Sequence, residues 1–240
     1  CPTLPNDPTN TLSHTHPNLR SLMPAFSNIP RADLALAART LYLNARDDAE
    51  IAADLTPFGY TAPDDYDAGI ALVTAFEAAT AAQSAEYADQ YAATDHARQT
   101  SAAVEARYSR HRQAARLAHR SGTDGYAALH LAGPLPDARA DLLDHARIFY
   151  QTLDARADLL DPIRGIDRTG VTDALALVTA ALAAAAAQTA ETGEAQRATV
   201  TANTAETDLR AHAAELAAVA RLALADKPQL REKLGLLERS

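Results

Sequence analysis

The chain has 240 residues and a formal net charge of −9, and alanine supplies 58 of the residues that make it 48% hydrophobic. An acidic chain is a poor general nucleic-acid binder, because neutralising phosphates requires a basic surface. The one cysteine excludes an intrachain disulfide and a cysteine-based zinc or iron-sulfur site. No apolar run approaches the roughly 20 residues that cross a bilayer, so we expect no membrane-spanning helix.

Residues 1–29 form a Pro-rich leader, with prolines spaced from Pro2 to Pro24. Cys1 is a candidate for lipidation: in a processed lipoprotein the signal peptide is removed, the cysteine carries the acyl chains and the leader serves as a tether. The alternative is an unrelated cleavage that leaves cysteine first. Under the lipoprotein interpretation, the lipid on Cys1 is the only link to a membrane. We then expect a cell-surface or extracellular location, with the cytoplasm as the alternative.

An internal duplication is predicted to relate residues 31–131 to residues 139–236. The matches follow an offset of 108 before the first inter-helix loop and of 105 after it. They pair Arg31-Ala32-Asp33-Leu34 with Arg139-Ala140-Asp141-Leu142, Tyr42 with Tyr150, Ala71-Leu72-Val73-Thr74-Ala75 with Ala176-Leu177-Val178-Thr179-Ala180, Gln83 with Gln188, and Glu86 with Glu191. A length change confined to a loop is what a duplicated fold tolerates.

Each copy is predicted to be helical throughout. After Pro30, where a helix can begin, apolar residues follow the four-and-three spacing of one helical stripe. The stripe positions are Leu34, Ala38, Leu41, Ala45, Ala49, Ala52 and Leu55 in copy one, and Leu142, Ala146, Phe149, Leu153, Ala157, Leu160 and Ile163 in copy two. We expect both stripes to be core.

A long helical segment follows in each copy, at residues 64–120 and 171–225. The first of them contains no proline and a single glycine. It is therefore either one very long helix or two helices joined near residues 94–95. In copy two, Asn203 followed by Glu206 resembles a capping box. We expect two antiparallel helices with a turn in each copy.

Each copy ends in a short helix, at residues 124–131 before Gly133 and at residues 227–234 before Gly235. Glycine after the last turn is a common C-terminal stop. The pattern predicts an all-α fold with two tandem antiparallel helical bundles. The predicted domains are the leader at 1–29, the first bundle at 30–133 and the second bundle at 134–240.

Two features carry a resemblance to a known class. They are the Ala-rich middle Ala75-Phe76-Glu77-Ala78-Ala79-Thr80-Ala81-Ala82 and the ending from Leu224-Ala225-Asp226-Lys227-Pro228 to Leu234-Gly235-Leu236. With these features the chain resembles Ala-rich bacterial proteins with tandem helical-bundle repeats. The resemblance covers most of residues 31–236, and it implies a helical fold and no known activity.

Known catalytic and metal-binding patterns do not occur in the sequence. Carboxylate-bridged metal pairs in helical bundles need Glu-x-x-His, and no glutamate here has a histidine three residues later. The metalloprotease, phosphate-loop, dinucleotide, haem-attachment and serine-elbow motifs are also absent. We predict no catalytic residue, no metal site and no cofactor.

One group of basic residues stands out in copy one. The basic cluster consists of Arg107, Arg110, His111, Arg112, Arg116, His119 and Arg120. On a helical wheel the first three lie apart from the other four. A solvated, ion-paired helix is the ordinary interpretation, and an interaction patch for an acidic partner surface is the other.

His111 has a further peculiarity, because the offset of 105 places it at the position of Leu216 on the apolar stripe. Burial would lower its pKa, and a neighbouring carboxylate would raise it. We expect a partly buried, hydrogen-bonded histidine, with a functional switch as the alternative.

Together these features favour a non-enzymatic structural or scaffolding protein. It would self-associate into a homo-oligomer or filament, or dock on a protein partner, as part of a filament or cell-surface assembly. Repeated surfaces in one chain allow head-to-tail contacts that produce rings or filaments. The alternative is a soluble or lipid-anchored binding module with a ligand or partner groove between the two bundles. A third interpretation is an enzyme of an unrecognised helical class, which would need a buried cluster of titratable residues.

Overall fold

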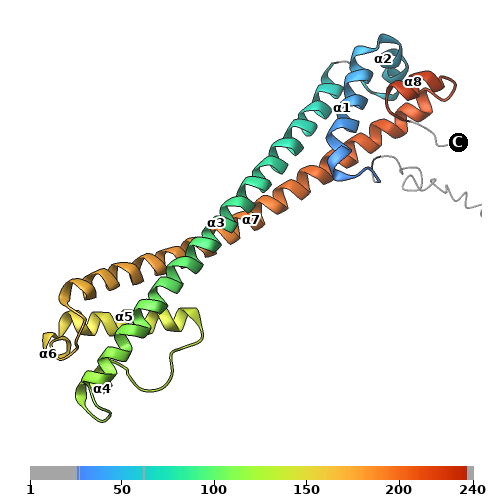
Figure 1. Ribbon diagram of the computed structural model, residues 1–240. Coiled ribbons are helices and arrows are strands. Elements are labelled where there is room, and N and C mark those ends of the chain that lie inside the picture. Colours follow the sequence, from blue (N-terminus) through green and yellow to red (C-terminus); the bar gives the residue numbers. More distant parts are fainter. Residues whose placement is uncertain (1–25, 27, 62, 237–240) are drawn as a thin grey trace, which may run out of the picture. The chain divides into compact units, whose positions relative to one another are not determined.

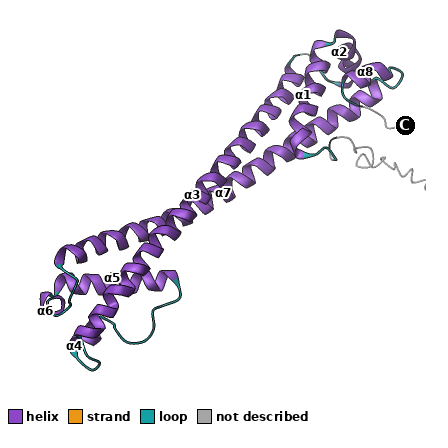
Figure 2. Cartoon of the chain, viewed as in Figure 1, coloured by secondary structure: helices purple, strands orange, loops and turns teal. Residues whose placement is uncertain are grey.

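The computed structural model describes residues 26, 28–61 and 63–236. This part of the chain is helices joined by loops, without a strand (Figure 2), so the predicted all-α fold class is confirmed. In chain order (Figure 1) the elements are α1 (Arg31–Asp47), α2 (Ala49–Leu55), the 3-10 helix η2 (Thr56–Phe58), α3 (Asp64–Ala118), α4 (Asp124–Ala128), α5 (Arg139–Ala155), α6 (Ala157–Leu160), α7 (Arg168–Ala223) and α8 (Pro228–Lys233). Cys1 and the leader up to residue 25 lie outside the described residues.

The two long segments are single continuous helices, α3 with 55 residues and α7 with 56 residues. The hairpins expected in their place, with a turn near residues 94–95, are therefore wrong. Alanine is the strongest helix former, and no proline interrupts either run. The weak helix formers in the middle cost too little to end a helix whose two halves are both held by packing.

Asn203 and Glu206, which resembled a capping box, lie inside α7 and bind α1 instead. Arg31 at the start of α1 donates from Nη1 to Asn203 Oδ1 at 3.4 Å, and its Nε lies 3.3 Å from a Glu206 carboxylate oxygen. The polar residues that suggested a helix start in the sequence are thus inter-helix contacts.

The first predicted stripe breaks at Asp48, where α1 ends and α2 begins. The Asp48 carboxylate accepts hydrogen bonds from the backbone N–H groups of Glu50 and Ile51 at 3.0 and 3.2 Å, which makes it the N-cap of α2. The new helix starts in a different register, so that Ile51 is buried and Ala49 is exposed. The predicted stripe is therefore right as far as Ala45 and again at Leu55, which is fully buried, but not at Ala49 and Ala52, which are not buried.

The chain forms two compact units, which differ from the predicted tandem bundles. Unit 1 comprises residues 1–78 and 203–240, and unit 2 comprises residues 79–202. Each unit contains the first half of one predicted copy and the second half of the other. The boundaries expected at 30–133 and 134–240 do not coincide with these units. Because α3 and α7 do not turn back, the two halves of each predicted copy belong to different units.

The core of unit 1 joins α1 and α2 to the C-terminal part of α7. Leu34, Leu41 and Tyr42 of α1 are fully buried in one cluster with Leu209 and Leu216 of α7. The α1 residues belong to the first predicted copy and the α7 residues to the second, because unit 1 combines residues 1–78 with residues 203–240. Burial of such side chains stabilises the folded state by about 1.5–3 kcal/mol each.

The core of unit 2 joins the C-terminal part of α3 to α5. Tyr108 of α3 lies 5.4 Å from Phe149, centroid to centroid, in an edge-to-face arrangement, and Tyr150 packs against both rings. Val104 and Leu143 complete the centre of this cluster. This aromatic group supplies the bulk that the Ala-rich helices lack.

Burial follows the two predicted offsets in both units. At the offset of 108, Leu34 and Leu142 are both buried. At the offset of 105, Val104 and Leu209 are both buried. The pairs one and two helical turns further on, Tyr108 with Ala213 and Arg112 with Ala217, are buried too. The predicted short helices are also present as α4 and α8. The glycines after them, Gly133 and Gly235, take left-handed φ values of +70° and +74°.

Helix α7 contains an apolar stretch that the sequence analysis did not predict. One 18-residue window has a mean hydropathy of 1.7, which is apolar enough to cross a membrane by length and composition alone, and only 28% of the window is buried. The expectation that no stretch is long and apolar enough was therefore too strict for this helix. Alanine is the most frequent residue of this helix.

Candidate functional site

The basic cluster divides into two sets, as the helical wheel indicates. Arg112, Arg116 and His119 bind backbone carbonyls of unit 2. Arg112 Nη2 donates to the carbonyl oxygens of Leu131, Ala132 and Gly133 at 3.1, 2.8 and 3.1 Å. Arg116 donates to the Leu131 oxygen at 2.8 and 2.6 Å and also to the Gly133 oxygen.

His119 belongs to the same set, since it is buried and its Nε2 lies 2.9 Å from the Leu159 carbonyl oxygen. These side chains bind the loop after α4 and helix α6. An acidic partner surface cannot reach the buried Arg112 and His119, so the predicted patch is reduced to its other members. Arg120 is exposed just beyond the end of α3.

The second set, Arg107, Arg110 and His111, lines a pocket of about 390 Å³ in unit 2. The opposite wall comes from the turn before α7 and from its first residues. The remaining lining residues are Ala114, Gly165, Ile166, Gly170 and Asp173. Sequence reasoning found the basic side of this pocket, but not the loop that faces it.

His111 is held by Tyr150 of α5, whose hydroxyl oxygen lies 3.1 Å from His111 Nδ1. Burial raises the pKa of Tyr150, so its hydroxyl stays protonated. Burial, and then the positive charges of Arg107 and Arg110, lower the pKa of His111. The expectation of a partly buried, hydrogen-bonded histidine is confirmed.

Unit 1 contains a similar tyrosine–histidine pair without the basic pocket. Tyr42 of α1, the repeat partner of Tyr150, places its hydroxyl 2.7 Å from His212 Nδ1. At the offset of 105, Arg110 corresponds to Glu215 and His111 to Leu216. The buried tyrosine is therefore common to both units, whereas the pair of arginines occurs in unit 2 alone.

Helices α3 and α7 pair within unit 2 through matching polar contacts. Gln83 of α3 donates to Thr199 of α7 at 3.2 Å, and Gln188 of α7 donates to Thr94 of α3 at 3.5 Å. Both residues of the second bond are the repeat partners of those of the first, at the offset of 105. The two helices therefore run antiparallel here, and the same contact is made twice with the helices exchanged.

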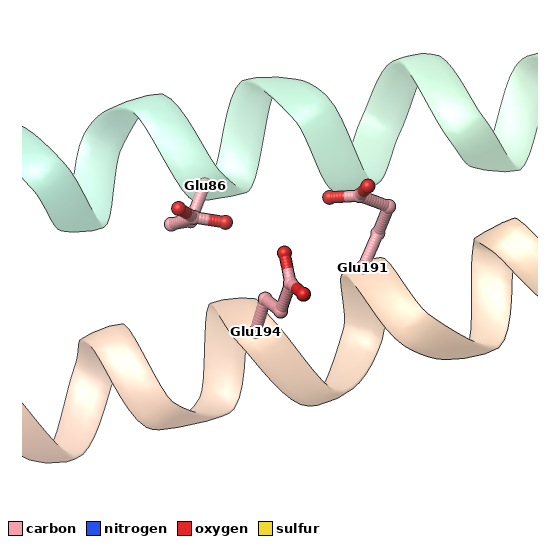
Figure 3. A group of neighbouring side chains, drawn as sticks. All are labelled: Glu86, Glu191 and Glu194. Carbon is pink, nitrogen blue, oxygen red and sulfur yellow. The ribbon is translucent and has the colours of Figure 1, made fainter.

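Three carboxylates meet between these matched contacts. Oxygens of Glu86 on α3 and of Glu191 and Glu194 on α7 all lie within 4.8 Å of one another, and Figure 3 shows them in the space between the two helices. Carboxylate oxygens are ligands that suit hard divalent cations. The three residues could thus hold such an ion, although exposed acidic groups commonly meet without one.

The predicted repeat accounts for the meeting of these like charges. Glu86 and Glu191 are repeat partners, and so are Asp89 and Glu194. In an antiparallel pair of repeated helices, equivalent positions meet only near the point midway between the matched contacts, and Glu86 and Asp89 lie close to the midpoint of residues 83 and 94. Burial, and then the charges of Glu194, Asp89 and Glu86, raise the pKa of Glu191. The absence of a Glu-x-x-His motif did not reveal this group, since its residues come from both copies.

Replacing Glu191 with glutamine is expected to raise the melting temperature at pH 7. Since the folded state raises the pKa of Glu191, folding is disfavoured once the carboxyl ionises. The gain should therefore shrink as the pH falls through the raised pKa of Glu191, and it should be absent below the ordinary value of 4.5. Thermal unfolding from pH 3.5 to pH 8 checks this, with the exposed Glu105→Gln as a control that should show no such gain. An equal gain at all pH values would show that ionisation of Glu191 is not the cause.

Comparisons with protein-family models, with curated protein sequences and with solved structures find no match to this chain. The resemblance to Ala-rich bacterial repeat proteins therefore stays a prediction. The lipidation candidate Cys1 lies outside the described residues, and its role stays a prediction as well.

Proposed function

We propose that the protein is a non-enzymatic structural component that associates with further copies of itself. It would act as the subunit of a filament or of a cell-surface assembly. The observation that supports this most is the apolar stretch of α7, which has a mean hydropathy of 1.7 and is 28% buried. A contiguous exposed apolar face is typical of an interaction surface.

The exposed face of this stretch lies in unit 2 and consists almost entirely of small apolar residues. Its exposed residues between positions 176 and 187 are Ala176, Thr179, Ala180, Leu182, Ala183, Ala186 and Ala187, and the exposed Thr172 and Asp173 precede them. Alanine side chains allow two helices to approach closely, so that many weak contacts form along the whole stretch. A second copy of the same helix provides a surface of matching shape and polarity.

Exposed leucines at equivalent repeat positions also favour self-association. Leu117 at the end of α3 is 89% exposed, and its repeat partner Leu222 at the end of α7 is 66% exposed. One of them belongs to unit 2 and the other to unit 1. A chain with the same apolar feature on both units can join head to tail, and such contacts produce rings or filaments.

Negative-stain electron microscopy and light scattering of the full chain test the proposal. We expect ordered assemblies or a mass that rises with concentration. Leu182→Glu and Ala183→Glu should each return the chain to monomers, because they place a charge in the apolar face. Gln196→Glu, an exposed change on the same helix outside this stretch, should leave assembly intact. Native protein that stays monomeric at high concentration would contradict the proposal.

The second candidate, a binding module, is favoured by the pocket at Arg107, Arg110 and His111 in unit 2. This pocket differs from the groove between two bundles that the sequence suggested. That groove stays a prediction.

A further inference from the structure

We propose that the pocket lined by Arg107, Arg110 and His111 binds a phosphate-type oxyanion, either free or as a monoester of a compact apolar group. This inference is independent of self-association, because it concerns a pocket inside unit 2 rather than the exposed face of α7. Three features of the pocket support this assignment: unpaired positive charge, the position of a third donor and the composition of the walls.

The two arginines bring positive charge that the described part of the chain does not neutralise. Neither Arg107 nor Arg110 has a carboxylate within ion-pair distance among the described residues. Arg110 uses only Nε, which donates to the Ala106 carbonyl oxygen at 3.2 Å. Its two terminal nitrogens are free for a ligand. Guanidinium groups bind phosphate and carboxylate oxygens through two parallel hydrogen bonds.

His111 adds a third donor in a fixed orientation. Its Nδ1 is occupied by the Tyr150 hydroxyl at 3.1 Å. When the hydroxyl donates this bond, the imidazole carries its proton on Nε2, and the imidazolium carries a proton there too. The ring therefore has an N–H available on Nε2 in both states. Because it lines the pocket one residue after Arg110, it completes a group of three donors.

The remaining walls limit what else the ligand can be. Ala114 and Ile166 form an apolar side, and the glycines Gly165 and Gly170 leave room for a group larger than a bare anion within about 390 Å³. Asp173 is the only carboxylate among the lining residues, so the lining keeps one net positive charge when His111 is neutral. An oxyanion that carries a small apolar group fits this combination.

Unit 1 offers an internal comparison. At the offset of 105 the positions of Arg107, Arg110 and His111 hold His212, Glu215 and Leu216. An acidic residue therefore replaces an arginine at the equivalent place. The pocket is not a by-product of the repeated fold, since the duplicated scaffold is present in both units and the basic lining in one.

A titration of the full-length chain followed by NMR of the His111 imidazole tests the proposal, with the His111 signal assigned from its loss in His111→Gln. Inorganic phosphate and phenyl phosphate are each added at constant ionic strength, with sodium chloride as the matched salt. We expect a saturable shift of the signal with either phosphate and a rise of the His111 pKa. Bound anion offsets the two arginine charges that now lower this pKa.

Variants separate a specific site from general charge attraction. Arg107→Gln and Arg110→Gln should each weaken phosphate binding about tenfold, because each removes hydrogen bonds from a charged donor. Asp173→Asn should strengthen binding. Arg120→Gln, an exposed arginine of the same cluster that does not line the pocket, should leave the affinity unchanged.

Two results would overturn the proposal. One is an equal shift with sodium chloride alone, and the other is unchanged affinity in the chain that carries both Arg107→Gln and Arg110→Gln. Tighter binding of phenyl phosphate than of inorganic phosphate would assign the site to a monoester. Equal affinity would assign it to the free anion. Neither outcome depends on assembly, so the Leu182→Glu variant should bind as the native chain does.

Discussion

Replacing Gly69 with alanine is expected to destabilise the chain by about 1–3 kcal/mol, the usual cost of overpacking a core. A Cβ atom at this position of α3 would lie 2.2 Å from Tyr42 Cε1 and 2.4 Å from Tyr42 Cδ1. The Tyr42 ring cannot easily move away, because it is fully buried and its hydroxyl bonds His212. The clash should therefore outweigh the gain in helix propensity of about 1 kcal/mol. Urea-induced unfolding of both proteins measures the difference.

Gly193→Ala provides the matched control, because the same change at this position should stabilise the chain by about 0.5–1 kcal/mol. Gly193 lies inside α7, and the nearest atom to an added Cβ is Arg197 Nη1 at 3.9 Å. Equal effects of the two substitutions would show that the Tyr42 ring gives way. The repeat partner of Gly69 is Ala174, which is buried in unit 2. The need for glycine is thus specific to the packing of unit 1.

The periodicity of the sequence predicted the helices and their buried faces well, because both depend on local spacing. Leu34, Leu41 and Leu142 are buried as the stripes require. The break at Asp48 was missed. An aspartate that caps a new helix looks the same in the sequence as one on a solvated face. Only the contacts of its carboxylate distinguish the two.

The division into units could not be predicted from the repeat itself. When two copies share the same apolar pattern, the second half of a copy can cover its own first half or that of the other copy. Both arrangements bury the same kinds of residues, as the exchange of equivalent elements in domain swapping illustrates. The continuity of α3 and α7 decides between them, and it depends on the small cost of the few weak helix formers within an Ala-rich helix.

The candidate sites were predictable to different degrees. The helical wheel correctly set Arg107, Arg110 and His111 apart from Arg112 and Arg116, because angles on a helix follow from sequence spacing. The facing wall of the pocket comes from the loop before α7, whose position depends on tertiary packing. Glu86 lies close to Glu191 because the repeated helices α3 and α7 pair in antiparallel orientation. This pairing could not be predicted while a turn near residues 94–95 was expected.

Arg112 illustrates how a basic residue predicted for docking acts inside the fold. It is 4% exposed, and its Nη2 donates to three successive carbonyl oxygens, those of Leu131, Ala132 and Gly133. Hydrogen bonds from a charged donor contribute about 1.5–3 kcal/mol each, and less when the acceptors can be hydrated instead. The repeat partner of Arg112 is Ala217, whose side chain cannot donate hydrogen bonds to the equivalent carbonyl oxygens in unit 1.

Arg112→Gln is therefore expected to cost about 2–3 kcal/mol of folding free energy. The glutamine is too short to reach all three carbonyl oxygens, so the loop after α4 should open more often. Hydrogen exchange at the backbone amides of residues 129–133 and of Leu135 would report this opening before global unfolding. Arg110→Gln, two residues earlier on the exposed side of α3, should leave both the exchange rates and the unfolding free energy nearly unchanged. Similar effects of the two substitutions would mean that the charge of the helix, rather than the carbonyl clamp, stabilises the loop.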